Sequence, residues 1–228
     1  CVPFLCRGRW RAGWFLRILI AMSKDNATSH DGRRQAEPGP NVALLLIDVI
    51  NDLAFDGGEA LREQALPMAH VITGLKRRAK EAGIPVIYVN DNYGHWQSDF
   101  QTVVEYCMRP EAPGRETTGL LRPEEDDYFV IKPRHSGFYQ TNLELLLKYL
   151  KVRTLILTGM AADMCVLFTA NDAYLREFQI VVPADCCAAE SEEYRRQALD
   201  LIERVLKADV SPAAKLDLVA LCEAEPQA

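Results

Sequence analysis

Three residues of different chemical type stand at or just after the ends of separate apolar runs. Asp48 ends the run VALLLID, Lys132 ends DYFVIK, and Cys165 follows TLILTG near the start of a predicted helix. A thiol in a first helical turn feels the positive end of the helix dipole, and a nearby lysine further favours the thiolate. An adjacent carboxylate accepts the thiol proton and returns it to a leaving group. The three residue types therefore predict nucleophilic attack by a thiol on a carbonyl or related carbon.

The elements that must position these residues alternate between strands and helices from Val42 onward. This alternation predicts an α/β fold, a single-domain, three-layer, doubly wound sandwich with a mostly parallel sheet of about six strands. Ligands of such sheets lie beyond the carboxyl ends of the strands, so the acid, the amine and the thiol are expected at one edge. The predicted strands are 42–48, 84–90, 127–132, 154–159, 179–185 and a short sixth at 207–210; the predicted helices are 59–82, 142–150, 163–177 and 191–206.

Composition limits the classes of partner. The chain of 228 residues has a net charge of −6, and its first 22 residues contain four arginines and no acid, so the rest is more acidic still. An acidic body argues against binding of nucleic acids and of anionic membranes. We interpret 1–41 as a flexible N-terminal extension, 42–210 as the folded domain and 211–228 as a C-terminal tail. For residues 1–21, a true start at Met22 is favoured over the two alternatives, a targeting segment and an amphipathic arm.

The cysteines and the missing motifs narrow the chemistry. Seven cysteines are present without a CxxC pair or zinc-ligand spacing, which is typical of a reduced, cytoplasmic protein. The chain contains no HExxH, GxSxG, GxGxxG or P-loop sequence, which removes zincins, serine α/β-hydrolases, dinucleotide-binding proteins and P-loop NTPases. We predict no cofactor and no metal.

Three ordered segments resemble motifs of the isochorismatase-like cysteine hydrolase superfamily. LLLIDVINDLAFDGG resembles its DxQNDF opening, and IKPRHSGFYQTNLELLL resembles its KxxxSxFxxTxL segment. LILTGMAADMCVLFTANDAYLREFQIVVPADCCAA resembles its GxxxDxCVxxTAxDA segment and the strand that follows. The resemblance covers about residues 42–210.

The resemblance implies a role for each member of the set. Asp48 would be the acid/base, Lys132 its electrostatic partner and Cys165 the nucleophile. The backbone N–H groups of Ala161 and Cys165 would form the oxyanion hole. The family also implies a cis peptide bond in this loop, here between Met160 and Ala161.

Departures from the family pattern bear on the substrate. Ile50 replaces the usual glutamine of the opening motif, and the DxH…H metal pattern of nicotinamidases is missing after the second strand, because Tyr93 follows Asp91 where the first histidine is expected. The retained Cys165 favours C–N hydrolysis over vinyl-ether hydrolysis, since isochorismatase domains of several siderophore systems lack it. Six residues are expected to line the substrate pocket: Tyr93, His95, Trp96, Arg134, His135 and Phe138.

These features predict a metal-independent cysteine hydrolase that cleaves a C–N bond of a small amide or ureido compound through a thioester. One alternative is an isochorismatase that releases pyruvate from isochorismate. Another is a non-catalytic binding or thiol-sensor protein on the same fold, in which the adjacent Cys186 and Cys187 would act. We expect a small-molecule substrate, no nucleic-acid or membrane partner, and a homo-oligomer.

Overall fold

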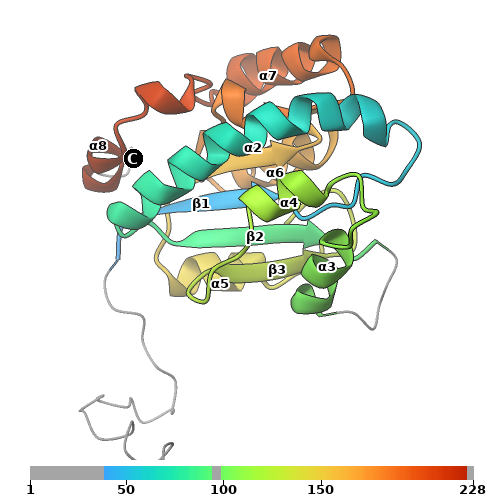
Figure 1. Cartoon of the computed structure of the whole chain (residues 1–228). Coiled ribbons are helices and arrows are strands. Elements are labelled where there is room, and N and C mark those ends of the chain that lie inside the picture. Colours follow the sequence, from blue (N-terminus) through green and yellow to red (C-terminus); the bar gives the residue numbers. More distant parts are fainter. Residues whose placement is uncertain (1–38, 94–98, 225–228) are drawn as a thin grey trace, which may run out of the picture. The chain divides into compact units, whose positions relative to one another are not determined.

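A parallel sheet organises residues 39–93 and 99–224, the part of the chain that the computed structural model describes. The strand order is β3–β2–β1–β4–β5, with β6 paired to β4, and every pairing among these strands is parallel (Figure 1). The bounds are β1 (Val42–Ile47), β2 (Val86–Asp91), β3 (Tyr128–Lys132), β4 (Thr154–Met160), β5 (Gln179–Val181) and β6 (Cys187–Ala188). The expectations for 1–38, including the start at Met22, fall outside the described residues.

Alternate side chains of the central strand serve two separate cores. All six residues of β1 are buried, as expected for a strand covered on both faces. Leu44 belongs to the hydrophobic cluster on one face of the sheet and Leu45 to the cluster on the other. The period-two geometry of a strand thus divides one apolar run between two layers of helices.

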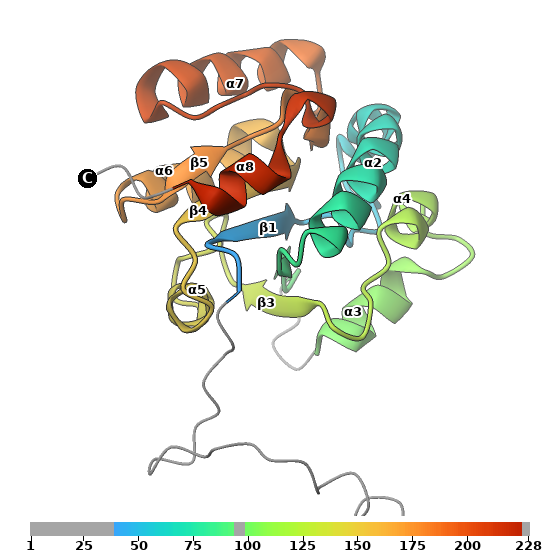
Figure 2. The same cartoon turned by 90° about the vertical axis from the view of Figure 1, so that its left-hand side faces the viewer.

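The helices cover both faces, which confirms the three-layer α/β fold. Four helices, the longest of them first in the chain, place side chains in the core on one face of the sheet. Three other helices place side chains in the core on the opposite face (Figure 2). The first group is α2 (Gly58–Glu81), α3 (Phe100–Cys107), α4 (Arg115–Leu120) and α8 (Leu218–Glu223); the second is α5 (Leu143–Tyr149), α6 (Leu167–Tyr174) and α7 (Glu192–Leu206).

The structure differs from the prediction in several places. The segment 207–210 forms only a single parallel bridge, between Val181 and Asp209, and the sixth strand is instead β6, which pairs beside Gly159. The helix predicted from 163 begins as a π-helical turn, η1 (Ala162–Val166), before it continues as α6. Helices α3 and α4 occupy a stretch for which no helix was predicted.

Beyond the last long helix, the chain still packs against the sheet layers. Leu216 and Leu218 are buried in the core that contains α2, and Arg78 of α2 donates hydrogen bonds to the carbonyl oxygens of Ala213 and Leu216. Among the described helices, none combines the length and apolar character needed to cross a bilayer.

Candidate active site

The carboxyl ends of three strands bring together an acid, an amine and a thiol. The Lys132 ammonium lies 2.8 Å from Oδ2 of Asp48 and 3.4 Å from Sγ of Cys165. The Cys165 thiol is also hydrogen-bonded to the Asp48 carboxyl group. Lys132 is fully buried, and the other two side chains are nearly so. The three residues that strand-end positions singled out therefore lie in direct mutual contact.

Asp48 is held by the backbone as well as by its partners. Its φ of 52° lies in the left-handed region, where an aspartate is one of the few tolerated L-residues. Its amide donates to the Val89 carbonyl, and its Oδ1 accepts a 2.7 Å hydrogen bond from the Asp91 amide. Burial raises the pKa of Asp48, and the Lys132 charge partly offsets this rise. The result is a buried carboxylate with a fixed orientation and an increased affinity for a proton.

Lys132 stands between two carboxylates. Its position opposite Asp91 in the β2–β3 register puts its ammonium 3.4 Å from Oδ2 of Asp91, in addition to the closer Asp48 contact. Burial opposes the charged form of Lys132, but the negative charges, first that of Asp48, outweigh it and raise its pKa. The amine therefore stays cationic and provides the positive charge at the centre of the site.

The resting nucleophile is a thiol rather than a thiolate. Burial, followed by the charge of Asp48, raises the pKa of Cys165, and the proximity of Lys132 only partly counteracts this. Lys132 thus favours the thiolate, as expected, but burial and the charge of Asp48 outweigh its effect. A neighbouring base must remove the thiol proton as the sulfur attacks, and Asp48 is hydrogen-bonded to it.

The loop before Cys165 follows β4 directly. The Met160–Ala161 peptide bond is cis, which confirms the expectation from the family resemblance. Gly159 has φ 114°, and a Cβ there would lie 2.0 Å from the Ile47 carbonyl oxygen, so only glycine fits beside the end of β1. This close approach sets the loop next to Asp48. Cys165 then falls within η1, a π-helical turn of a kind often found at functional sites.

A hydrogen-bonded chain fixes the nucleophile relative to the loop after β3. The Thr169 hydroxyl donates a 2.7 Å hydrogen bond to the Cys165 carbonyl oxygen and accepts one of 3.0 Å from the Gly137 amide. Thr169 is fully buried. One turn further along the helix, Asp172 accepts a hydrogen bond from the Ser136 hydroxyl. These contacts tie the helix of Cys165 to the segment that begins with Lys132.

The residues expected to line a substrate pocket are only partly brought together. His135 Nδ1 lies 3.6 Å from Cys165 Sγ, and its ring packs against Phe168. Arg134 is exposed. Within the described part of the chain, its guanidinium group donates a hydrogen bond only to the carbonyl oxygen of its neighbour Pro133. Phe138 is buried in the core, where Arg176 stacks on its ring. His95 and Trp96 lie outside the described residues.

The sixth expected pocket residue, Tyr93, holds the loop after β1. Its hydroxyl donates a 2.9 Å hydrogen bond to the Ile50 carbonyl, and the Asn90 side chain bonds both the N–H and the carbonyl of Ile50. The Ile50 side chain itself is buried in the core. Ile50, which replaces the family's glutamine, thus contributes packing through its side chain, and the side chains of Tyr93 and Asn90 bind its backbone.

The donor set around Asp91 does not resemble a metal site. One carboxylate oxygen accepts the Tyr93 amide, and the other faces the Lys132 ammonium. Within 39–93 and 99–224, no cluster of three or more histidine, cysteine or acidic side chains has the geometry to hold a metal ion.

Sequence reasoning noted Asp91 as a strand end without assigning it a role, and it missed Thr169. The signal for Thr169 was its position four residues after Cys165, which places it on the same helix face. Asp91 had no such signal, because its contact with Lys132 depends on which strands are neighbours.

The isochorismatase domain family matches residues 42–213. The isochorismatase family protein YaaI of Bacillus subtilis is 43% identical over 169 residues, which are 74% of this chain and 92% of that protein. Ureidoacrylate amidohydrolase RutB of Serratia proteamaculans is 28% identical and aligns over 68% of this chain and 73% of its own. The crystal structure of N-carbamoylsarcosine amidase from Thermoplasma acidophilum superposes with a TM-score of 0.59 at 27% identity, over 77% of this chain and 98% of that one.

Proposed function

Because the chain belongs to the isochorismatase family of hydrolases, we propose that it is a cysteine hydrolase that cleaves a C–N bond of a small amide or ureido compound without a metal. The observation that carries the proposal is the contact of the Cys165 thiol with both Asp48 and the Lys132 ammonium. Two similar proteins, a ureidoacrylate amidohydrolase and an N-carbamoylsarcosine amidase, support C–N cleavage as the reaction type.

In the first half-reaction, Sγ of Cys165 forms a bond to the carbonyl carbon while Asp48 takes the thiol proton. The electron pair of the C=O bond moves to oxygen. When the tetrahedral intermediate collapses, the C–N bond breaks and Asp48 gives its proton to the leaving nitrogen. Ammonia or an amine leaves, and a thioester remains on Cys165.

In the second half-reaction, Asp48 takes a proton from water as the water oxygen attacks the thioester carbon. The C–S bond then breaks, the carboxylic acid leaves, and Asp48 returns the proton to the sulfur. Lys132 stays cationic throughout, since its charge balances whichever of its neighbours is negative. Each cycle consumes one water and leaves the enzyme unchanged.

The developing oxyanion would be bound by the backbone N–H groups of Ala161 and Cys165. Ala161 lies between the end of β4 and η1, and Cys165 lies within η1. Backbone donors that are fixed before the reaction stabilise such an anion without reorganisation.

The two alternatives receive less support. A thiol sensor would rely on Cys186 and Cys187, but both are buried, and burial raises the pKa of each, for Cys187 to about 12. Such thiols react slowly with oxidants and electrophiles. Isochorismate hydrolysis does not require a nucleophilic sulfur, and it leaves the contacts of Cys165 without a purpose.

An ammonia-release assay over a panel of small amides and ureido acids tests the proposal. We expect release of ammonia from at least one member of the panel, and none from the same compounds with the Cys165→Ala variant. Release of pyruvate from isochorismate without any amide turnover would contradict the proposal and favour the isochorismatase alternative. Reversible disulfide formation without turnover would favour the thiol sensor.

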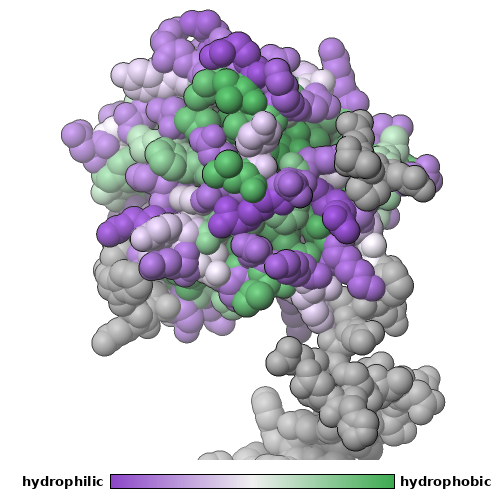
Figure 3. Space-filling view, turned by 180° about the vertical axis from the view of Figure 1, so that it is seen from behind, coloured by the Kyte–Doolittle hydropathy of each residue, from purple (hydrophilic) through white to green (hydrophobic). Residues whose placement is uncertain are grey.

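We also propose that the protein is cytoplasmic and forms a homo-oligomer. The described cysteines are all free, which fits a reducing compartment. On the rear face of the molecule, which Figure 3 shows, hydrophobic side chains interrupt the hydrophilic surface. Leu145 of α5 and Leu175 at the end of α6 are 70% and 75% exposed. Light scattering on the purified protein measures the oligomeric state, and a monomer at micromolar concentration would contradict the second proposal.

A further inference from the structure

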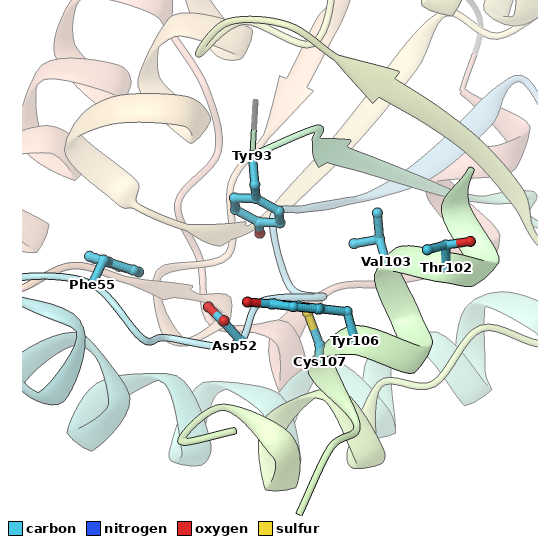
Figure 4. Close-up of a pocket in the computed structure, with 7 residues that line it drawn as sticks. All are labelled: Asp52, Phe55, Tyr93, Thr102, Val103, Tyr106 and Cys107. Carbon is cyan, nitrogen blue, oxygen red and sulfur yellow. The ribbon is translucent and has the colours of Figure 1, made fainter. Parts of the chain in front are cut away.

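A cavity of about 270 Å³ lies beside the active site, between the loop after β1 and helix α3. Its walls are mostly aromatic and aliphatic, and Figure 4 shows the Tyr93 ring projecting into it from the end of β2. The seven lining residues are Asp52, Phe55, Tyr93, Thr102, Val103, Tyr106 and Cys107. Ligand pockets usually have volumes of about 300–1,000 Å³. This cavity is slightly smaller, so it suits a group with a single ring.

Tyr93 connects this cavity to the proposed catalytic residues. Its hydroxyl bonds the carbonyl of Ile50, two residues after Asp48, and its amide bonds the Asp91 carboxylate that contacts Lys132. After burial, the charge of Asp48 contributes most to raising the pKa of Tyr93. The phenol of Tyr93 therefore lies within electrostatic range of both the catalytic carboxylate and the cavity wall.

The cavity contains one carboxylate among apolar groups. Asp52 Oδ1 accepts the Ala54 amide, and Oδ2 lies 3.8 Å from the guanidinium of Arg109, too far for a direct hydrogen bond. Figure 4 shows the Asp52 carboxylate close to the hydroxyl end of Tyr106. Next to Tyr106, at the same end of α3, burial and the charge of Asp52 raise the pKa of Cys107 to about 12, so this wall stays neutral.

Three aromatic rings define the shape of the group that fits. Phe55 and Tyr106 are about half exposed, and the Tyr93 ring projects into the cavity. The Arg109 guanidinium stacks 3.4 Å from the centre of the Tyr106 ring, which orients that ring and puts a positive charge near Asp52. Because a cation is already stacked there, a neutral flat group complements the cavity better than a second cation.

We propose that this cavity is a specificity subsite, which takes an aromatic ring of the substrate and binds a hydrogen-bond donor on that ring through Asp52. The proposal rests on the proposed hydrolase function for its connection to turnover. It narrows the substrate class to small amides or ureido compounds that carry a hydroxylated or amino-substituted aromatic ring. The ring would lie against Tyr93 and Tyr106, and its donor would point to Oδ2 of Asp52.

Binding of three small probes tests the subsite without any turnover. Phenol has a flat ring and a donor, anisole lacks the donor, and cyclohexanol lacks the flat ring. By NMR titration of the full chain, we expect phenol to bind more tightly than the other two. Tyr106→Ala should weaken phenol binding about threefold to tenfold, the usual range for losing one aromatic contact. Asp52→Asn, which keeps the side-chain shape, should reduce the preference for phenol over anisole at least about threefold.

Tyr149→Ala is the matched control, because Tyr149 on α5 is 45% exposed, as is Tyr106. It should leave phenol binding unchanged, and thermal unfolding checks that each variant is folded. If Tyr106→Ala and Asp52→Asn both bind phenol as the wild type does, the subsite is refuted. If only Tyr106→Ala unfolds, the phenol preference of Asp52→Asn decides by itself.

Turnover then separates this proposal from the hydrolase function. The substrates are 3-(4-hydroxyphenyl)propionamide and butyramide, compared by the ratio of their kcat/KM values. We expect the ratio to fall at least about threefold in Tyr106→Ala and to stay constant in Tyr149→Ala. If both amides are hydrolysed with an unchanged ratio, the subsite is wrong and the hydrolase stands. If neither amide nor any panel member is hydrolysed, while phenol binding still depends on Tyr106 and Asp52, the hydrolase function is wrong and the cavity remains an aromatic binding site.

Discussion

The ammonium of Lys132 lies 2.8 Å from the carboxylate of Asp48, with both side chains withdrawn from water. Burial alone would favour a neutral Asp48, and the lysine charge limits this effect. An aspartate balanced in this way binds a proton more readily than an exposed one. That is the property which a base needs when it removes and then returns the proton of a thiol.

Asp48→Asn should slow turnover at least about a hundredfold, the usual scale for losing a general acid/base. The asparagine has nearly the same shape but cannot take the proton of the thiol or of water. Because the negative charge beside the sulfur is gone while Lys132 remains, the pKa of Cys165 should fall in this variant. The measurements are steady-state rates and the pH dependence of alkylation of Cys165 by iodoacetamide.

The control is Asp200→Asn on the exposed side of α7, which should behave as the wild type in both assays. Alkylation of Asp48→Asn should reach its half-maximal rate at a lower pH than the wild type does. Near-normal turnover in Asp48→Asn would leave Asp48 with only a structural role at the end of β1.

Both the acid and the alkaline limb of the pH profile of kcat/KM should lie at higher pH than the ordinary pKa values of an aspartate and a cysteine would give. Since burial raises the pKa of Asp48 above the 3.8 of an ordinary aspartate, the base becomes protonated, and activity is lost, at a higher pH as the solution is acidified. On the alkaline side, the pKa values of Cys165 and Lys132 are both raised, so the loss should begin above the ordinary thiol value of 9.0. Rates with a neutral amide between pH 4 and 11 measure both limbs. An alkaline limb below 9.0 would contradict the proposed protonation of the site.

Thr169→Val should reduce kcat between about tenfold and a hundredfold, because small misplacements of a reacting group are costly. Valine has the shape of threonine but cannot donate to the Cys165 carbonyl or accept the Gly137 amide. It also leaves a buried N–H unpaired, which lowers the free energy of unfolding by about 1–3 kcal/mol. Thr169→Ser, which keeps the hydroxyl, should restore most of the rate. If the serine and valine variants turn over equally, the hydroxyl does not position the nucleophile.

Activity should survive exhaustive dialysis against EDTA. A metal ion at Asp91 would lie close to the Lys132 ammonium, and the two positive charges would repel each other in a buried site. The assay compares ammonia release before and after dialysis, and again after zinc, iron or manganese is added. Loss of activity that a divalent metal restores would overturn the metal-independent mechanism and return nicotinamidase-like chemistry to consideration.

Much of the fold was predictable because the sheet is covered on both sides. Buried parallel strands read as continuous apolar runs, so β1 and β4 stood out, and the long helix α2 had a clear helical period. Helix α3 is only eight residues long, and its pattern of Phe100, Val103, Val104 and Cys107 was too short to stand out. Strand β6 has two residues, and no local pattern marks a strand of that length.

The site was predictable in its residues but not in its proton positions. Asp48, Lys132 and Cys165 each follow a recognisable strand, and parallel strands end at one edge of the sheet. The protonation of Cys165 depends on its burial and on the distance to Asp48, which are properties of the folded chain. The reasoning from the helix dipole and the lysine charge omitted these two larger effects.

The most direct test of the account is the ammonia-release rate of Cys165→Ala beside those of Cys186→Ala and Cys187→Ala. All three replacements remove a buried thiol, but only Cys165 contacts Asp48 and Lys132. We predict a loss of about a thousandfold or more for Cys165→Ala, the usual scale for removing a nucleophile from a catalytic unit, and near-normal rates for the other two. A Cys165→Ala protein that keeps more than about a tenth of the wild-type rate would contradict the covalent mechanism.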